Sequence, residues 1–343
     1  MSSITGVSAA DTPGPDDDLH EGGPEGRTPA GDGASTGRLG DKIFGGLAGG
    51  AGLIVVLLVT LVGAFLVIQA VPSLLDNESN FLFSQDWDVD SSPLHFGIAR
   101  LLWVTVLSSV LAMCIAVPLS VCIALFLTQY APKWLAKPGA ALIDLLAAVP
   151  SIVYGLWGVF TVGPHFQPVQ DALTSVLGWF PLFSDEGASA ARTIAFVSVI
   201  LAIMILPIIT ALSREVFAQT PQAHKDAATA LGATNWEVIR TAVLPFGKPG
   251  VISASMLGLG RALGETVAVM MIVSSLADGA PWSWSMFTGG ETFASKIANN
   301  AGEFDDPGKT GAFIAAGLVL FILTFIVNAI ARIVIERRKA FTE

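Results

Sequence analysis

Two charged residues lie inside a run of small and apolar residues, the stretch GLGRALGETVAVMM at 258–271. Arg261 and Glu265 are four residues apart, so on a continuous helix they share a face and can touch. A guanidinium can also bind a phosphate or a carboxylate through two parallel hydrogen bonds. The spacing therefore allows two interpretations. The charges form a neutral pair that locks helix packing, or they line a polar path on which Arg261 leaves Glu265 to meet an anion.

The composition places these charges in a membrane protein. Hydrophobic residues make up 52% of the 343-residue chain and charged residues 13%, whereas about a quarter of an ordinary soluble domain is charged. The net charge of -10 argues against a nucleic-acid partner, which requires a basic surface. The histidines are scattered, and Cys114 and Cys122 would be about 12 Å apart on one helix. We therefore expect no disulfide, metal site or cofactor.

Six runs are apolar and long enough to cross a bilayer, which takes about 20 residues. We predict an all-α integral membrane fold with six transmembrane helices, at 44–74, 101–127, 140–162, 193–212, 251–276 and 311–333. Pro150 and Pro207 interrupt the third and fourth runs. Such prolines are tolerated where neighbouring helices or water satisfy the freed carbonyls, so they favour kinked helices around a cavity.

The basic residues fall mainly on one side of the membrane if six helices alternate. That side holds residues 1–42, the loop after the second run, the loop after the fourth run and the end of the chain, whereas the opposite loops are mostly acidic. Because cytoplasmic loops carry an excess of Lys and Arg, we expect a multi-pass protein of the cell membrane with both termini in the cytoplasm.

Residues 1–42 differ in composition from the rest of the chain. They are rich in Gly, Pro and Asp and nearly free of large apolar residues, so they cannot bury enough surface to fold. We expect a disordered acidic cytoplasmic tail, with a regulatory docking arm as the alternative. Residues 43–338 then form the transmembrane domain, and 213–250 form its longest cytoplasmic loop.

The fifth run would carry Arg261 deep into the bilayer. Ten residues of helix from the start of the run rise about 15 Å, which is half of a hydrocarbon core of roughly 30 Å. An arginine there costs about 2.5–3.5 kcal/mol on insertion scales, so it is not expected to face lipid unaided. A helical wheel puts Arg261 and Glu265 on the face of the small residues Ala254, Gly258 and Ala268. A second helix or a solute fits against such a face.

The third run offers further polar groups, in VPSIVYGLW at 149–157. One arginine cannot neutralise a dianion, so a second cation from a partner or the backbone N–H groups of a broken helix would be needed. Pro150 frees a carbonyl here, and Ser151 and Tyr154 bring hydroxyls. These hydroxyls either line the polar path or bond locally within a kinked helix.

The loop 213–250 contains the signals of two short helices. Thr220 fits an N-cap with Pro221 at the first helical position, and Gly232 fits the residue that ends a helix. Two helices joined by a turn form a compact unit that can dock into a groove on a partner. The alternative is an amphipathic connector that lies on the bilayer.

The second of these helices begins with the spacing of a capping box, at Thr234 and Glu237. Its period predicts one apolar face. The residues of that face are Trp236, Ile239 and Val243. We expect the helix to end before Pro245, because proline cannot donate to the preceding turn.

The stretch DAATALGATNWEVIRTAVLP at 226–245 resembles the EAA loop of bacterial ABC-importer permeases. That loop has Glu-Ala-Ala, three residues, Gly, nine residues and Ile-x-Leu-Pro. Six residues fall at the matching spacing: Asp226, Ala227, Ala228, Gly232, Leu244 and Pro245. Asp226 stands for the glutamate and Ala242 for the isoleucine. In the family this loop enters a cleft of a separate ATPase subunit and transmits its closure, so the resemblance implies that role for the six residues.

The chain has no nucleotide-binding signature of the type G-x-x-x-x-G-K-[ST]. The stretch GLGRALG lacks the glycine spacing and the preceding strand of a dinucleotide site. We also find no nucleophile–base constellation in the sequence. We therefore expect a transport subunit rather than an enzyme, with ATP hydrolysis on a partner chain.

The stretches AAVPSIVYGLWGVF at 147–160 and GLGRALGETVAVMM together look like the PstC-type permease of bacterial phosphate ABC importers. The continuation VAVMM favours this type over the sister PstA type. The resemblance covers about residues 101–338. It implies the type I importer architecture and half of a path for inorganic phosphate across the bacterial cell membrane.

The same resemblance implies three partners: a sister permease, a dimer of ATPase subunits, and an external phosphate-binding protein that we expect to dock near 278–293. The family's intramembrane arginine and glutamate fall on Arg261 and Glu265. Phosphate rests on the resemblance alone. Sulfate, molybdate or another oxyanion stays an alternative substrate, and a docking or phosphate-sensing platform stays an alternative function.

Overall fold

The computed structural model describes residues 36–184, 187–276, 279–304 and 306–339. Residues 1–35, most of the predicted tail, lie outside the described residues. The chain divides into two units, residues 1–58 and 59–343, and each is described by itself. Helix α1 (Thr36–Leu75) begins in the first unit. Residues 36–42, which we predicted as the end of the disordered tail, are therefore helical. Almost all its side chains over 40–58 are exposed.

The described part of the second unit is mainly helical and contains one antiparallel hairpin, in which β1 (Trp87–Asp88) pairs with β2 (His95–Phe96). Its longer helices are α2 (Ala99–Leu125), α3 (Lys133–Ala147), α6 (Ile194–Ala218), α9 (Leu244–Leu263) and α12 (Pro307–Lys339). Its shorter helices are α4 (Ser151–Trp157), α5 (Gln167–Leu177), α7 (Gln222–Ala230), α8 (Asn235–Val238), α10 (Val267–Ile272) and α11 (Phe293–Asn299).

Tighter and wider turns extend several of these helices. The π-turns are η1 (Phe126–Tyr130), η2 (Gly158–Val162) and η6 (Ile239–Val243), and the 3₁₀ turns are η3 (Gly163–His165), η4 (Pro181–Phe183), η5 (Ala190–Arg192) and η7 (Ala301–Glu303).

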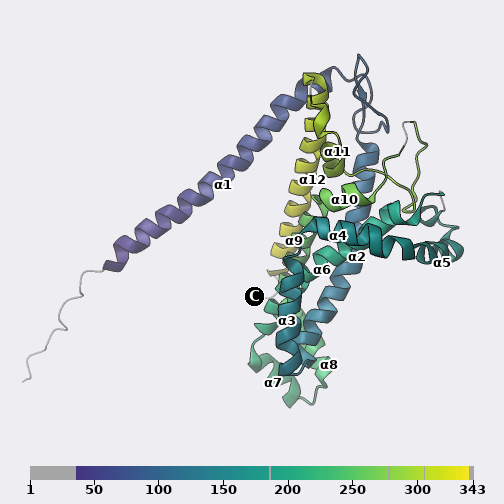
Figure 1. Cartoon of the computed structure of the whole chain (residues 1–343). Coiled ribbons are helices and arrows are strands. Elements are labelled where there is room, and N and C mark those ends of the chain that lie inside the picture. The colour runs from purple at the N-terminus through teal and green to yellow at the C-terminus, as the bar shows by residue number, and fades with distance from the viewer. Residues whose placement is uncertain (1–35, 185–186, 277–278, 305, 340–343) are drawn as a thin grey trace, which may run out of the picture. The chain divides into compact units, whose positions relative to one another are not determined.

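Helix α6 lies at the centre of the packing, between α2 and α9 (Figure 1). Its large apolar side chains are buried all along its length, among them Phe196, Ile200, Ile205 and Ile209. A helix that is apolar on every face is stable only when it is surrounded, by protein or by lipid. Helix α6 is surrounded largely by this chain, whereas α2, α9 and α12 keep much of their apolar surface exposed.

Five helices of the described residues are long and apolar enough to cross a membrane, and a sixth span results if α3 and the helical segment that starts with α4 are counted together. This pair is bent by 93° at the break before Ser151. The predicted all-α membrane fold is therefore confirmed. The predicted kink at Pro150 is a sharp change of direction, because Pro150 is extended (φ −60°, ψ 141°) and begins a new helix.

The fifth predicted span, at 251–276, is wrong at both ends. One helix runs without a break from Asn235 to Leu263, through Pro245, where we predicted an end. Pro245 directly follows the π-turn η6, in which the Leu244 N–H donates to the Ile239 carbonyl five residues earlier. This locally altered hydrogen-bond ladder accommodates a residue without an N–H. The helix then stops at Gly264, and Glu265 and Thr266 are not helical.

The two short helices α7 and α8 form, with their connecting turn, residues 222–238, which we call the foot. Its turn is made by Gly232 at φ +83°, as predicted from a helix-ending glycine. The capping box is confirmed, since Glu237 N–H donates to Thr234 Oγ1 and Thr234 N–H donates to the Glu237 carboxylate. The first cap is wrong by one residue, because Pro221, not Thr220, precedes α7.

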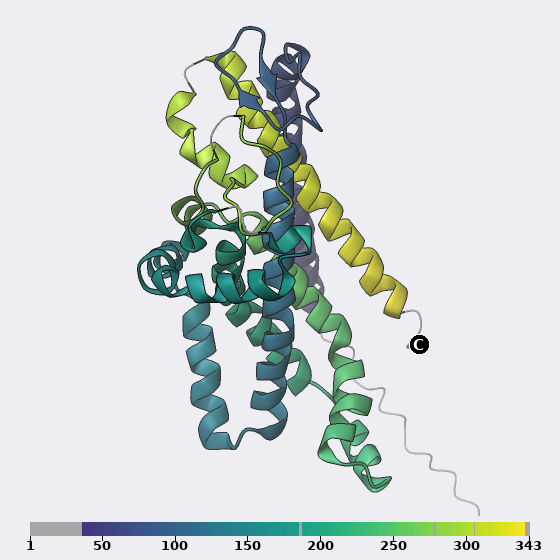
Figure 2. The same ribbon diagram turned by 90° about the vertical axis from the view of Figure 1, so that its right-hand side faces the viewer.

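The foot and the β-hairpin lie at opposite ends of the long helices α2 and α6 (Figures 1 and 2). The end with the foot also carries the connection from α2 to α3. The end with the hairpin carries α11 and the loop that follows α10. This arrangement separates the basic loops from the acidic ones, as alternating spans require.

Candidate functional site

Arg261 lies in the last turn of α9, three residues before the C-cap Gly264. The final carbonyls of a helix have no partner within it and carry partial negative charge. A positive side chain in the last turn offsets that charge, so Arg261 stabilises a helix end that lies among apolar helices. Among the described residues, Arg261 makes no ion pair.

Glu265 serves the next helix instead of pairing with Arg261. Its Oε1 accepts a hydrogen bond of 3.0 Å from the N–H of Ala268, in the first turn of α10. The Glu265 side chain is buried, with 8% of the residue exposed. The prediction that Arg261 and Glu265 touch as an i, i+4 pair is therefore wrong. It assumed a continuous helix, and the break at Gly264 turns each charge to a different helix end.

The break lies about halfway along α6. A Cβ at Gly258 of α9 would lie 2.7 Å from Cδ1 of Ile209, and the two helices run in opposite directions. Ile209 is about 22 Å from the start of α6 at Ile194, and Arg261 is about 4.5 Å beyond Gly258. Arg261 thus lies about 18 Å along α6, near the middle of its apolar length.

The two broken spans meet each other, since α4 packs against α10. A Cβ at Gly155 would lie 3.1 Å from the Cα of Ala268, which is closer than most Cβ atoms in proteins come to a neighbouring heavy atom. The glycine therefore allows the backbones of α4 and α10 to approach directly. The third and fifth spans thus combine their interruptions into one irregular region, which membrane proteins keep for places lined by protein or water.

The hydroxyl of Tyr154 bonds across the bend, donating to the carbonyl oxygen of Leu146 at 2.9 Å. Leu146 is one of the carbonyls that the break at Pro150 frees, so this bond holds the two helices at their angle. The local interpretation of Tyr154 is therefore the one that the geometry favours. Ser151 is half-buried at the start of α4.

Arg261 opens onto a hollow of about 470 Å³ between α6, α9 and α12. Six residues line it: Ile208, Met256, Leu257, Gly260, Arg261 and Asn328. We call it the Arg261 hollow. Apart from Arg261 and Asn328 its lining is apolar. A cation that opens onto such a hollow, with no acidic partner in it, can receive an anion.

The foot presents its matched residues to solvent. Asp226 is exposed and its Oδ1 accepts a bond of 2.9 Å from Gln222, Ala227 and Gly232 are exposed, and Ala228 is half-buried. Two large apolar side chains are exposed here, Leu231 (89%) and Trp236 (57%). Leu244 and Pro245 lie beyond the foot, at the start of α9.

The predicted apolar face of the second helix is correct only in part. Ile239 and Val243 are buried against α2 and α6, whereas Trp236 points away from them into solvent. The π-turn changes the angular spacing within this helix, which a 3.6-residue period does not anticipate. An exposed tryptophan beside an exposed leucine is typical of a surface that a partner covers.

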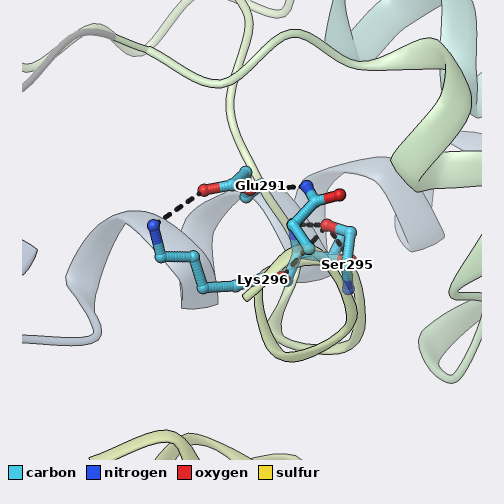
Figure 3. Close-up of polar contacts among 5 residues, drawn as sticks. Glu291, Ser295 and Lys296 are labelled. Carbon is cyan, nitrogen blue, oxygen red and sulfur yellow. Dashed lines mark hydrogen bonds and ion pairs between the residues drawn. The ribbon is translucent and has the colours of Figure 1, made fainter. Parts of the chain in front are cut away.

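The opposite end holds an ion pair that the sequence did not indicate. Lys296 Nζ lies 3.1 Å from Glu291 Oε2, and Asn299 donates to Oε1 of the same carboxylate at 2.8 Å (Figure 3). The ammonium also lies 5.9 Å from the ring centre of Trp87, beside the hairpin. Only the five-residue spacing between these opposite charges could have suggested this pair from the sequence. The pair holds α11 to the loop before it, so the charge of Lys296 is neutralised by Glu291, unlike that of Arg261.

A family model described as "Binding-protein-dependent transport system inner membrane component" matches residues 116–340. The chain is 52% identical over 298 residues to the phosphate transport system permease protein PstC 2 of Mycobacterium tuberculosis, covering 86% of this chain and 91% of that protein. It is 54% identical over 271 residues to PstC of Mycobacterium leprae, with 78% and 84% covered. It is 37% identical over 291 residues to PstC of Haemophilus influenzae, with 83% and 90% covered.

One solved structure supports the fold independently. The chain superposes on a subunit of the MetNI methionine ABC transporter in an inward-facing conformation, with a TM-score of 0.52 over 70% of this chain and 95% of that one. The sequences are 14% identical, so this likeness concerns the arrangement of helices and nothing more.

Proposed function

Since the chain belongs to the family of binding-protein-dependent transport system inner membrane components, we propose that it is the PstC-type permease subunit of an ATP-driven importer of inorganic phosphate. In such an importer it forms half of the translocation path. It is a transport subunit, and the ATP is hydrolysed on a separate chain. The names of its relatives support phosphate as the substrate.

One observation carries the proposed path: the unpaired Arg261 at an interrupted span, open to a hollow. A guanidinium binds an oxyanion with two parallel hydrogen bonds. Glu265 is engaged by Ala268 N–H, so it does not compete for the cation. We assign Arg261 and Ser151 to the path itself. Glu265 and Tyr154 hold the broken helices that form it.

The foot is the proposed contact with a dimer of ATPase subunits. Asp226, Ala227, Ala228 and Gly232 lie in its first helix and turn, and Leu231 supplies an exposed apolar side chain. Leu244 and Pro245 continue the foot into the helix that carries Arg261. A displacement of the foot therefore reaches the path without crossing a loop.

The orientation follows from the two separated ends. We infer that the basic end with the foot faces the cytoplasm, together with both termini. The hairpin and the loop after α10 then face outward. There Trp103, Trp282 and Trp284 cluster, with ring centres 4.9–6.2 Å apart, and Trp284 is exposed. Trp282 and Trp284 lie within the segment 278–293 where we expect the phosphate-binding protein to dock, and Trp103 packs against them from α2. A sister permease completes the path.

Uptake of radiolabelled phosphate tests the proposal. The chain is co-expressed with its sister permease and ATPase, purified, and placed in vesicles with the binding protein outside. We expect ATP-dependent uptake that unlabelled phosphate blocks. If unlabelled sulfate or molybdate blocks it instead, the substrate is the other oxyanion. No uptake together with a complex that forms without any ATPase would favour the docking or sensing platform.

Two variants separate the path from the foot. Arg261→Gln should abolish uptake while ATP hydrolysis by the complex persists. Asp226→Lys should uncouple hydrolysis from uptake while the subunits still co-purify. Normal uptake by Arg261→Gln would remove Arg261 from the path, and normal coupling by Asp226→Lys would remove Asp226 from the ATPase contact.

A further inference from the structure

Asn328 is a polar residue in the apolar part of α12, where most neighbours are Ala, Ile, Leu, Val or Phe. Its side chain is exposed, and among the described residues it has no hydrogen-bond partner. Thr324, one turn earlier on the same helix, donates to its own helix at Phe321, at 2.9 Å. The Asn328 amide cannot be explained by such a local bond.

An exposed amide is costly in a bilayer. It carries two N–H donors and a carbonyl acceptor, and in hydrocarbon each would lose its bonds to water. Polar side chains within spans therefore face a water-filled cavity, a substrate or another subunit. The position of Asn328 in the fold indicates which of these three surroundings its amide faces.

Asn328 lines the Arg261 hollow and faces it from α12, across from the α9 wall that carries Arg261. The two side chains are its only hydrogen-bonding side chains among the described lining residues. The remaining walls are Ile208, Met256, Leu257 and the backbone of Gly260. A lone amide and a lone guanidinium in one apolar hollow form a complementary set: the cation attracts an anion, and the amide orients it.

We propose that Asn328 is a substrate-contacting residue that binds the oxyanion together with Arg261, on the foot side of the helix break. This inference rests on the proposed function and adds a second residue to it. The amide N–H donates to one phosphate oxygen while Arg261 supplies the positive charge. The amide carbonyl accepts the P–OH proton that phosphate carries at neutral pH. Sulfate carries no such proton, so Asn328 also favours phosphate over sulfate.

Cysteine labelling tests the position. In a background with Cys114→Ser and Cys122→Ser, which replaces two exposed free thiols, Asn328→Cys is introduced and the complete complex is placed in vesicles. A negatively charged methanethiosulfonate reagent is supplied on the foot side. We expect the reagent to modify Asn328→Cys and inorganic phosphate to slow that reaction at least fivefold. The Arg261→Gln substitution should remove the protection.

Phe325→Cys is the matched control. Phe325 is 67% exposed on the same helix and does not line the hollow. We expect this position to react with an uncharged, membrane-permeant maleimide and not with the charged reagent. Thr324→Val is the functional control, and its phosphate uptake should equal that of the parent.

Uptake kinetics provide the second measurement. Asn328→Leu should raise the KM for phosphate about five- to tenfold, the loss expected for one or two hydrogen bonds, and should narrow the preference for phosphate over sulfate. Asn328→Ser should recover part of the affinity. The inference is overturned if the charged reagent does not reach Asn328→Cys, if phosphate gives no protection, or if Asn328→Leu instead prevents the subunits from assembling. Because the parent complex is assayed alongside, failure of phosphate uptake by the parent would count against the proposed function itself.

Discussion

The break at Gly264 makes a quantitative prediction about Glu265. If this side chain caps α10, its removal leaves the N–H of Ala268 without a partner, since Ala268 is fully buried and its N–H donates to Glu265 Oε1 at 3.0 Å. A buried donor left unsatisfied costs about 1–3 kcal/mol. Glu265→Ala should therefore destabilise α10 by that amount. Glu265→Gln retains a carbonyl oxygen at the same place and should lose less than about 1 kcal/mol.

Hydrogen–deuterium exchange measures this difference locally. Opening of α10 exposes its amides, and about 1–3 kcal/mol corresponds to roughly 5- to 150-fold faster exchange over residues 267–272. We expect that acceleration in Glu265→Ala and less than about fivefold in Glu265→Gln. A peptide from α6 in the same sample is the internal reference, because the hydrogen bond of Glu265 is made to Ala268 in α10 and not to α6.

The ion-pair interpretation makes the opposite prediction. If Glu265 neutralised Arg261, Gln and Ala would leave the same unpaired cation and would be equally damaging. The additional substitution Arg261→Gln would then restore stability. Equal effects of the two Glu265 variants, together with rescue by Arg261→Gln, would refute the capping argument.

Three further substitutions follow from the contacts. Gly155→Val should destabilise the protein by about 1–3 kcal/mol through overpacking, because its Cβ would lie 3.1 Å from the Cα of Ala268. The thermal stability of the purified complex measures this loss. Gly317→Ala is the tolerated control, since its Cβ would lie 3.6 Å from Cδ1 of Ile297. Tyr154→Phe should lose about 0.5–1.5 kcal/mol with its bond to Leu146 and leave phosphate protection in the labelling assay unchanged. Thr234→Val should lose about 1 kcal/mol of capping and weaken the coupling of ATP hydrolysis to uptake, while hydrolysis itself persists.

Much of the fold could be predicted because its signals are local. Pro150 lacks an N–H and begins a new helix, although Pro207 lies within the unbroken helix α6. Gly232 is suited to a positive φ, and the capping box at Thr234 needs only two side chains three residues apart. The number of apolar runs also follows directly from composition. These features depend on few residues, so tertiary context does not override them.

The site could be predicted by residue type but not by geometry. Arg261 is conspicuous as a cation in an apolar run. Its separation from Glu265 depends on the end of α9 at Leu263, beyond which α10 begins in a new direction and packs on α4. The only sequence signal for that end was Gly264, a helix-ending glycine within a run otherwise long enough to span. Asn328 was not predicted as a site residue, because only the three-dimensional hollow relates this amide to Arg261.

The uninterrupted helix from Asn235 to Leu263 fixes the angular relation between the foot and the path. Each helical residue advances about 1.5 Å and turns about 100°, so the direction in which Arg261 faces is set by the number of residues between them. Inserting one alanine between the foot and Gly258 would hardly lengthen the helix, yet it would rotate Arg261 about 100° away from its hollow. Inserting a full turn of four residues would nearly restore the direction, with an error of about 40°, while shifting Arg261 by about 6 Å. The length of this helix is thus constrained by rotation as well as by the thickness of the bilayer.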